Sequence, residues 1–131
     1  MKEIKAGTVY LAGAGPGDPG LLTARVIELL RHCNCIVYDA LVSPEVMSLA
    51  STTAERVYVG KRGNQHAVEQ PGINRILAEK ARAGKSVLRL KGGDPYLFGR
   101  GAEEALHLVD QGVGVEVIPG VTAGIAAPAY A

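Results

Sequence analysis

The fold can be inferred from one stretch of the sequence, Arg89-Leu-Lys-Gly-Gly-Asp-Pro-Tyr-Leu-Phe-Gly-Arg-Gly101. It opens inside an apolar run, Val87 to Leu90, which predicts a buried strand. The Gly-Gly-Asp-Pro sequence after Lys91 ends that strand, because glycine and proline interrupt regular structure. Glycine also lets a ligand approach the backbone closely, so the junction predicts bare backbone and one carboxylate, Asp94, at the end of a sheet. A tight strand-to-helix turn capped by Asp94 is the alternative for this stretch alone.

The same succession of strand, loop and helix occurs five times along the chain. The strands are apolar and β-branched, and no hairpin turn signals separate them, which favours a parallel sheet. We therefore expect an α/β domain with a five-stranded, mostly parallel sheet and helices on both faces. Strands are predicted at residues 8–11, 35–38, 56–59, 87–90 and 115–118, and helices from residue 19 onward and at about 44–49, 71–83 and 99–111.

Two helix boundaries are predicted from residues that favour helix ends. Asp18 is expected to cap the helix that carries Leu22, Val26 and Leu29, with Pro19 in its first turn, where a missing N–H group has no cost. Gly84 is expected just past the end of the helix at 71–83.

The composition limits the kinds of protein to consider. The 131 residues suffice for one domain with a single hydrophobic core, and 47% hydrophobic with 21% charged residues is typical of globular proteins. A net charge of +1 does not indicate a nucleic-acid-binding or membrane-surface protein. No apolar run is longer than a strand, and residues 1–5 do not resemble a signal peptide, so we expect a cytoplasmic protein without a membrane span.

Cysteine and histidine do not form a metal-binding pattern. Cys33 and Cys35 have no second pair to complete a zinc site, and we expect both to be buried free thiols. His32, His66 and His107 are scattered without ligand spacing. We therefore expect no metal.

The ends of the predicted strands carry the residues of chemical interest. In an open parallel sheet, ligands bind in the crevice outside the carboxyl ends of the strands. That edge is predicted to collect glycine-rich loops together with Asp39, Lys61, Lys91 and Asp94. This convergence indicates a ligand site more strongly than any single motif.

The loop at residues 13–20 also permits a dinucleotide interpretation, because Gly13-x-Gly15 follows a strand and precedes a helix. The loop departs from the fingerprint, since Asp18 stands where the third glycine or alanine belongs. Pro16 and Pro19 also remove two N–H donors from a loop that needs such donors to bind phosphate. Because Asp39 could bind a ribose, a nicotinamide-binding module stays open as an alternative.

Asp39 and Lys61 follow two different predicted strands. Taken singly, each could be a surface charge at the end of a strand. Together at one edge, they could act as proton acceptor and proton donor, roles that need a carboxylate and an ammonium group within reach of one substrate.

The sequence from Val9 to about Tyr130 resembles the amino-terminal domain of the tetrapyrrole methylase family. Two stretches are similar to the family's signatures, Val9-Tyr-Leu-Ala-Gly-Ala-Gly-Pro-Gly-Asp-Pro-Gly-Leu-Leu-Thr23 and the stretch at 89–101 quoted above. Within the family, Val37-Tyr-Asp-Ala-Leu-Val-Ser43 and Val59-Gly-Lys-Arg62 resemble the enzymes that act on uroporphyrinogen III. A methylase of this family with another substrate is the alternative.

The resemblance implies an activity. S-adenosylmethionine would methylate two ring carbons of uroporphyrinogen III to give precorrin-2, which leads to sirohaem and cobalamin. An electron-rich pyrrole carbon attacks the methyl group in line, so the protein mainly holds both partners in register. By the same resemblance, Asp39 is the proton acceptor and Lys61 the proton donor. The positions implied to line the cofactor are Pro16, Gly92, Gly93, Asp94, Leu97, Thr122 and Ala123.

Cations near the edge should bind the carboxylates of such a substrate. Charge complementarity makes Arg62, Lys91 and Arg100 the candidates, with solvated surface charge as the alternative for each.

Members of the family have a second domain of similar size and are typically homodimers. The apolar end of this sequence, residues 123–131, leads us to expect that residues 1–131 are one domain of a longer, two-domain enzyme. A stand-alone, non-catalytic binding domain is the remaining alternative.

Overall fold

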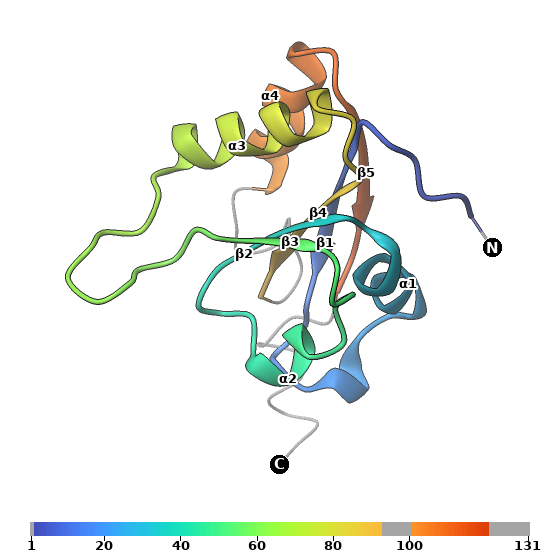
Figure 1. Cartoon of the computed structure of the whole chain (residues 1–131), viewed down its shortest axis with the longest axis vertical. Helices are drawn as coiled ribbons and strands as arrows, with labels where there is room; N and C mark the ends of the chain where they lie inside the picture. The colour runs from blue at the N-terminus through green and yellow to red at the C-terminus, as the bar shows by residue number, and fades with distance from the viewer. Residues whose placement is uncertain (1, 93–100, 121–131) are drawn as a thin grey trace.

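A computed structural model, which describes residues 2–92 and 101–120, has one sheet between two layers of helices (Figure 1). The sheet has five strands in the order β3-β2-β4-β1-β5, and every pair of neighbours is parallel. The predicted fold class, an α/β domain with a parallel sheet, is confirmed. The strands are β1 (Thr8–Gly13), β2 (Cys35–Tyr38), β3 (Glu55–Tyr58), β4 (Val87–Lys91) and β5 (Gly114–Ile118).

The strand order explains why the helices form two layers. The chain moves from β1 to β2 and β3 in one direction across the sheet, then returns to β4 and β5 in the other. Because crossovers between parallel strands are right-handed, the two directions place their helices on opposite faces. The helices are α1 (Ala24–His32) and α2 (Pro44–Met47) on one face, and α3 (Gln70–Arg82) and α4 (Gly101–Asp110) on the other (Figure 1).

One predicted helix start is wrong. Asp18 and Pro19 begin only a short 3-10 helix, η1 (Pro19–Leu21), in which Asp18 accepts a hydrogen bond from the N–H of Gly20 at 2.8 Å. The chain is extended again at Leu22, and α1 starts after Thr23, whose hydroxyl accepts a bond from the N–H of Val26 at 3.3 Å. Thr23 is therefore the cap of α1, because the first turn closes on its side chain.

The predicted end of α3 is confirmed. Gly84 follows the helix with a φ of +89°, a conformation that glycine adopts without a steric penalty.

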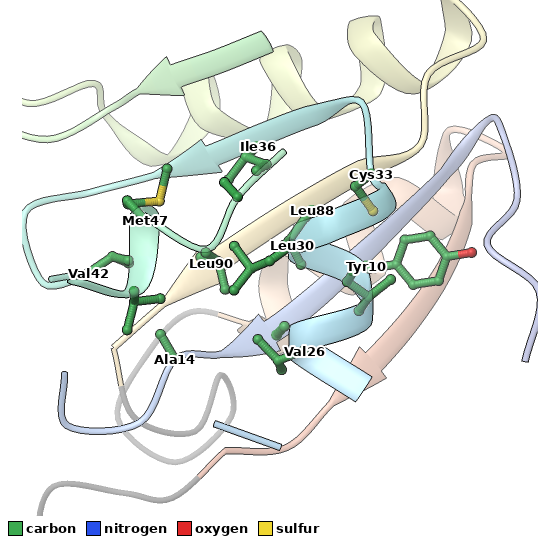
Figure 2. Close-up of a cluster of buried hydrophobic side chains, with 14 of the residues drawn as sticks. Tyr10, Ala14, Val26, Leu30, Cys33, Ile36, Val42, Met47, Leu88 and Leu90 are labelled. Carbon is green, nitrogen blue, oxygen red and sulfur yellow. The ribbon is translucent and has the colours of Figure 1, made fainter. Parts of the chain in front are cut away.

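The face covered by α1 and α2, hereafter the α1/α2 face, is packed with apolar side chains. Val26 and Leu30 of α1 lie against Leu88 and Leu90 of β4 (Figure 2). The same cluster contains Cys33, which is buried and free as predicted.

The face covered by α3 and α4, the α3/α4 face, receives the alternate residues of the same strands. Leu77 of α3 and Leu108 of α4 are fully buried against it, in one cluster with Val87 and with Cys35, the second buried free thiol. The alternation follows from the strand geometry, in which successive side chains point to opposite faces. Within residues 2–92 and 101–120, no helix has the length and apolar character that crossing a membrane requires.

Candidate functional site

All five strands end at the same edge of the sheet, because they are parallel. We call it the carboxyl edge. Two hydrogen bonds tie neighbouring strand ends together there: the N–H of Ala14 donates to the carbonyl of Lys91 at 2.6 Å, and the N–H of Val59 to that of Tyr38 at 2.9 Å. The structure thus brings the loop after β1, Asp39, the turn at Lys61 and the end of β4 to one side of the molecule.

The loop after β1 is fastened to the start of α2. Ser43 donates from its hydroxyl to the carbonyl of Gly17 at 2.7 Å and accepts from the N–H of Val46 at 3.2 Å, so one side chain caps α2 and holds the loop. Gly15 and Gly17 have φ values of +66° and +105°, which other residues rarely adopt. Pro16 lies exposed between them.

The backbone at the ends of β3 and β4 lies against the segment after β2, and glycine makes both approaches possible. A Cβ atom at Gly92 would lie 3.0 Å from the Cβ of Leu41, and one at Gly60 would lie 3.0 Å from the backbone nitrogen of Ala40. Leu41 is 74% exposed, so an apolar side chain stands open to solvent beside Gly92. Backbone and an exposed apolar group are thus adjacent at the carboxyl edge.

Asp39 is held from two sides. Its Oδ1 accepts a hydrogen bond from the N–H of Leu41 at 3.0 Å, and its Oδ2 lies 3.7 Å from Nη2 of Arg89. The Asp39 side chain is 24% exposed, whereas that of Arg89 is 3% exposed. The predicted proton acceptor therefore faces a buried cation and still reaches solvent.

Arg89 and Glu104 form a buried ion pair that the sequence reasoning did not identify. Nε of Arg89 lies 3.4 Å from Oε1 of Glu104, a side chain with no exposed surface. Arg89 is a charge in the middle of strand β4, between the apolar residues Leu88 and Leu90, and such a charge needs a buried partner. This charge within an apolar run is the sequence signal that could have indicated the pair.

The two lysines of the predicted site differ in their surroundings. Nζ of Lys91 lies 3.5 Å from Oε1 of Glu104, and burial lowers the pKa of Lys91, although the neighbouring carboxylate of Glu104 opposes this shift. Lys61 is exposed in the turn after β3, and its carbonyl accepts a hydrogen bond from the hydroxyl of Tyr58 at 3.1 Å. Lys91 thus faces inward, while Lys61 is accessible to a ligand.

A pocket of about 740 Å³ opens next to Asp39, between α2 and the end of β3. The guanidinium of Arg62 lies 5.2 Å from the centre of the Tyr58 ring, which in turn packs edge-on against Tyr38 at 5.3 Å. Arg56, which the sequence analysis did not select, supplies a second cation. The lining residues are Tyr38, Asp39, Ala40, Val42, Pro44, Met47, Ser48, Arg56, Tyr58 and Arg62.

The remaining predicted residues lie outside the part of the chain that the structure describes. They are Gly93, Asp94, Leu97 and Arg100, between β4 and α4, and Thr122 and Ala123, after β5. Among the residues that are described, no group of three or more His, Cys, Asp or Glu side chains is arranged to hold a metal ion.

Comparison with known proteins assigns the family. Residues 8–131 match the family model "Tetrapyrrole (Corrin/Porphyrin) Methylases". The chain belongs to the tetrapyrrole methylase family. It is 52% identical over 131 residues to a siroheme synthase of Pseudomonas aeruginosa and 53% identical over 127 residues to that of Chromobacterium violaceum. It covers only 28% and 27% of those two proteins, respectively.

Solved structures of this family share the fold. The uroporphyrin III C-methyltransferase of Thermus thermophilus superposes with a TM-score of 0.79 at 48% identity, over 92% of this chain and 48% of that one. The same enzyme complexed with S-adenosylhomocysteine gives 0.79 at 50% identity, again over 92% and 48% of the two chains. A cobalt precorrin-4 methyltransferase gives 0.83 at 31% identity, over 95% and 50%. The chain thus spans about half the length of these enzymes.

Proposed function

We propose that this chain is the cofactor-binding part of an S-adenosylmethionine-dependent methyltransferase that converts uroporphyrinogen III to precorrin-2. The carrying observation is the 48–50% identity to uroporphyrin III C-methyltransferase over 92% of the chain. The product would serve sirohaem or cobalamin synthesis. The complete enzyme would add a second domain, form a homodimer and work in the cytoplasm.

The described part of the carboxyl edge supports cofactor binding there. Close backbone approach at Gly92, the exposed side chain of Leu41 and the turn at Pro16 offer main-chain polar groups and an apolar surface to an adenosyl group. Gly93, Asp94, Leu97, Thr122 and Ala123 would complete the set. When bound, S-adenosylmethionine supplies an electrophilic methyl group on a sulfonium centre, and for the methyl transfer itself the residues of the chain would orient the two reactants.

The charged groups fit the second reactant. Methylation at a ring carbon requires a proton to leave the ring system, and Asp39, which is partly exposed, would accept it. Lys61, exposed in the neighbouring turn, would return a proton elsewhere on the ring. Arg62 and Arg56 line the pocket beside Asp39 and would bind substrate carboxylates, with Arg100 as a further cation proposed from the sequence. Lys91, also proposed from the sequence, faces buried Glu104 and is less accessible to a substrate carboxylate.

The test is transfer of labelled methyl from S-adenosylmethionine to uroporphyrinogen III, measured for this chain and for the complete product of its gene. We expect label in the tetrapyrrole with the complete protein and little or none with residues 1–131 alone. Asp39→Asn should lower the rate about 100-fold or more, because general-base catalysis contributes about that much. Absence of label with both folded proteins would rule out this substrate.

Two controls separate the alternatives. If the chain belongs to a methylase for another substrate, the unmodified protein should transfer little methyl to uroporphyrinogen III. Asp39→Asn and Lys61→Met should then leave that low rate unchanged. A nicotinamide-binding module would be stabilised thermally by NAD, whereas the proposed function predicts stabilisation by S-adenosylhomocysteine.

A further inference from the structure

We propose that Arg89 and Glu104 are positioning residues, which hold the carboxylate of Asp39 in the orientation that proton transfer requires. The inference rests on the proposed function, in which Asp39 is the proton acceptor. It concerns two side chains that lie beneath the carboxyl edge and do not reach its surface.

The guanidinium of Arg89 is fixed in three directions. Nε points to Oε1 of Glu104 at 3.4 Å, Nη1 donates to the carbonyl of Leu90 at 3.1 Å, and Nη2 lies 3.7 Å from Oδ2 of Asp39. A guanidinium is planar and rigid, so fixing two of its nitrogens also fixes the third. The position of the Nη2 group that faces Asp39 is therefore set by Leu90 and Glu104.

Glu104 gathers further donors from α3 and from the end of β4. Its Oε1 accepts from Nε2 of Gln70 in α3 at 3.1 Å and lies 3.5 Å from Nζ of Lys91, while its Oε2 has no hydrogen-bond partner among the described residues. A fully buried carboxylate costs free energy, and an apolar side chain of similar size usually packs at least as well. Stability alone thus gives no reason for a glutamate here, whereas holding Arg89 does.

Asp39 has little freedom left between its two contacts. The bond from the N–H of Leu41 orients Oδ1, and Arg89 faces Oδ2. Gln70, Glu104, Arg89 and Asp39 then form one chain of contacts from α3 through α4 and β4 to the carboxyl edge. At the carboxyl edge this chain of contacts ends in Asp39, whose side chain is 24% exposed and accessible to a substrate.

The test is a double-mutant cycle on methyl transfer by the complete gene product. Arg89→Lys keeps the charge beside Glu104 but replaces the rigid fork with a single point charge. We expect kcat to fall about 100-fold, as for a misplaced catalytic group, with both KM values within about 3-fold. In the Asp39→Asn background the same substitution should change the residual rate less than about 3-fold, because coupled residues are not additive.

Glu104→Gln is the second variant, and it should lower kcat by about 10-fold. Its matched control is Glu79→Gln, on the exposed side of α3. Melting temperatures are measured for every variant. A loss from Arg89→Lys that is equal in both Asp39 backgrounds would mean a structural role only and would overturn the proposal.

An NMR measurement separates this inference from the proposed function. The Nε–H signal of Arg89 is assigned by its absence in Arg89→Lys. Its proton should exchange slowly with water in the unmodified protein and faster in Glu104→Gln. Glu79→Gln should leave the exchange rate unchanged. Asp39→Asn should shift the signals of the Arg89 side chain. Unchanged signals in Asp39→Asn would overturn the positioning role, even if methyl transfer to uroporphyrinogen III is absent and the proposed function has failed for its own reasons.

Discussion

The two faces of the sheet are built from the same strands and differ in what they bury. The cluster on the α1/α2 face consists of apolar residues, with Cys33 and Tyr10 as its most polar members. The α3/α4 face buries Arg89 and Glu104 beside its apolar cluster, with Lys91 at its margin. Among the described residues, the buried charged side chains Arg89 and Glu104 lie on the α3/α4 face, whereas Arg25 on the other face stays partly exposed.

The difference indicates which face supports chemistry. Residues 88 and 90 of β4 point to the apolar face, while residues 87, 89 and 91 point to the charged one, so a single strand supplies both kinds of surface. Buried charge is costly and is retained where it has a further use. That charge leads directly to Asp39 at the carboxyl edge, which connects the α3/α4 face to the proposed proton transfer.

The largest effect on stability should come from breaking the buried ion pair on one side only. Glu104→Leu removes the fully buried partner of Arg89 and leaves it only the more distant, partly exposed Asp39, so it should lower the free energy of unfolding by about 3–5 kcal/mol. Adding Arg89→Met should recover most of this loss, because a matched pair of apolar side chains replaces the ion pair. Urea unfolding of the single and double variants measures both effects.

Leu30→Ala on the α1/α2 face is the comparison. It should cost about 3 kcal/mol by creating a cavity beside a fully buried side chain, and adding Arg89→Met should not recover it. The loss of stability in the double variant Glu104→Leu/Arg89→Met could instead equal the sum of the losses in the single variants Glu104→Leu and Arg89→Met. The two charges would then not be coupled, and the contrast between the faces would be wrong.

Much of the fold follows from local sequence pattern. Short apolar runs such as Val87–Leu90, separated by helical periodicity, predict parallel strands, and the five strands are found within about two residues of their predicted places. The start of α1 could not be predicted in the same way, because Asp18 and Thr23 are both good capping residues. Which of them starts the long helix depends on how Leu22 packs against the α1/α2 face.

The site was predictable as far as topology determines it. Parallel strands bring Asp39 and the turn at Lys61 to one edge whatever their side chains do. The pair Arg89–Glu104 was not predictable, because sequence indicates that Arg89 needs an acid but does not distinguish Glu103 from Glu104. Only the rotation of α4 against the sheet, which buries Glu104 and exposes Glu103, decides between them.

A second cluster of one carboxylate and two cations is partly exposed, and it can be compared with the buried cluster of Glu104, Arg89 and Lys91. Glu55 pairs with Lys80 and Lys85 at the opposite edge of the sheet, with 36% of its side chain exposed. The two lysines lower the pKa of Glu55 from 4.5 to about 2. Its stabilising contribution is therefore complete above about pH 4.5 and is lost as the pH falls towards about 2.

Glu55→Gln should accordingly lower the free energy of unfolding at pH 7 by about 1 kcal/mol or less, since solvent screens an exposed pair. The gap between the variant and the unmodified chain should narrow steadily as the pH falls below about 4.5. Urea unfolding from pH 7 down to pH 3 measures it. A gap of constant size would show that these lysines do not stabilise the charged form of Glu55.

The smallest effect concerns the two thiols, one on each face. Burial raises the pKa of Cys33 to about 12 and that of Cys35 to about 11, so at pH 8 neither is a thiolate while the chain is folded. Alkylation by iodoacetamide then requires opening of the structure around each thiol. In Cys35→Ala the remaining Cys33 reports opening of the α1/α2 face, and in Cys33→Ala the remaining Cys35 reports opening of the α3/α4 face.

If the two faces open separately, a change on one should speed labelling mainly on that side. Leu30→Ala should accelerate alkylation of Cys33 several-fold more than that of Cys35, and Glu104→Gln should do the reverse. Equal acceleration of both thiols in both variants would mean that the sheet opens only as a whole. Loss of the charge at Glu104 would then weaken the entire domain, because β4, which carries Arg89, also supplies Leu88 and Leu90 to the opposite face.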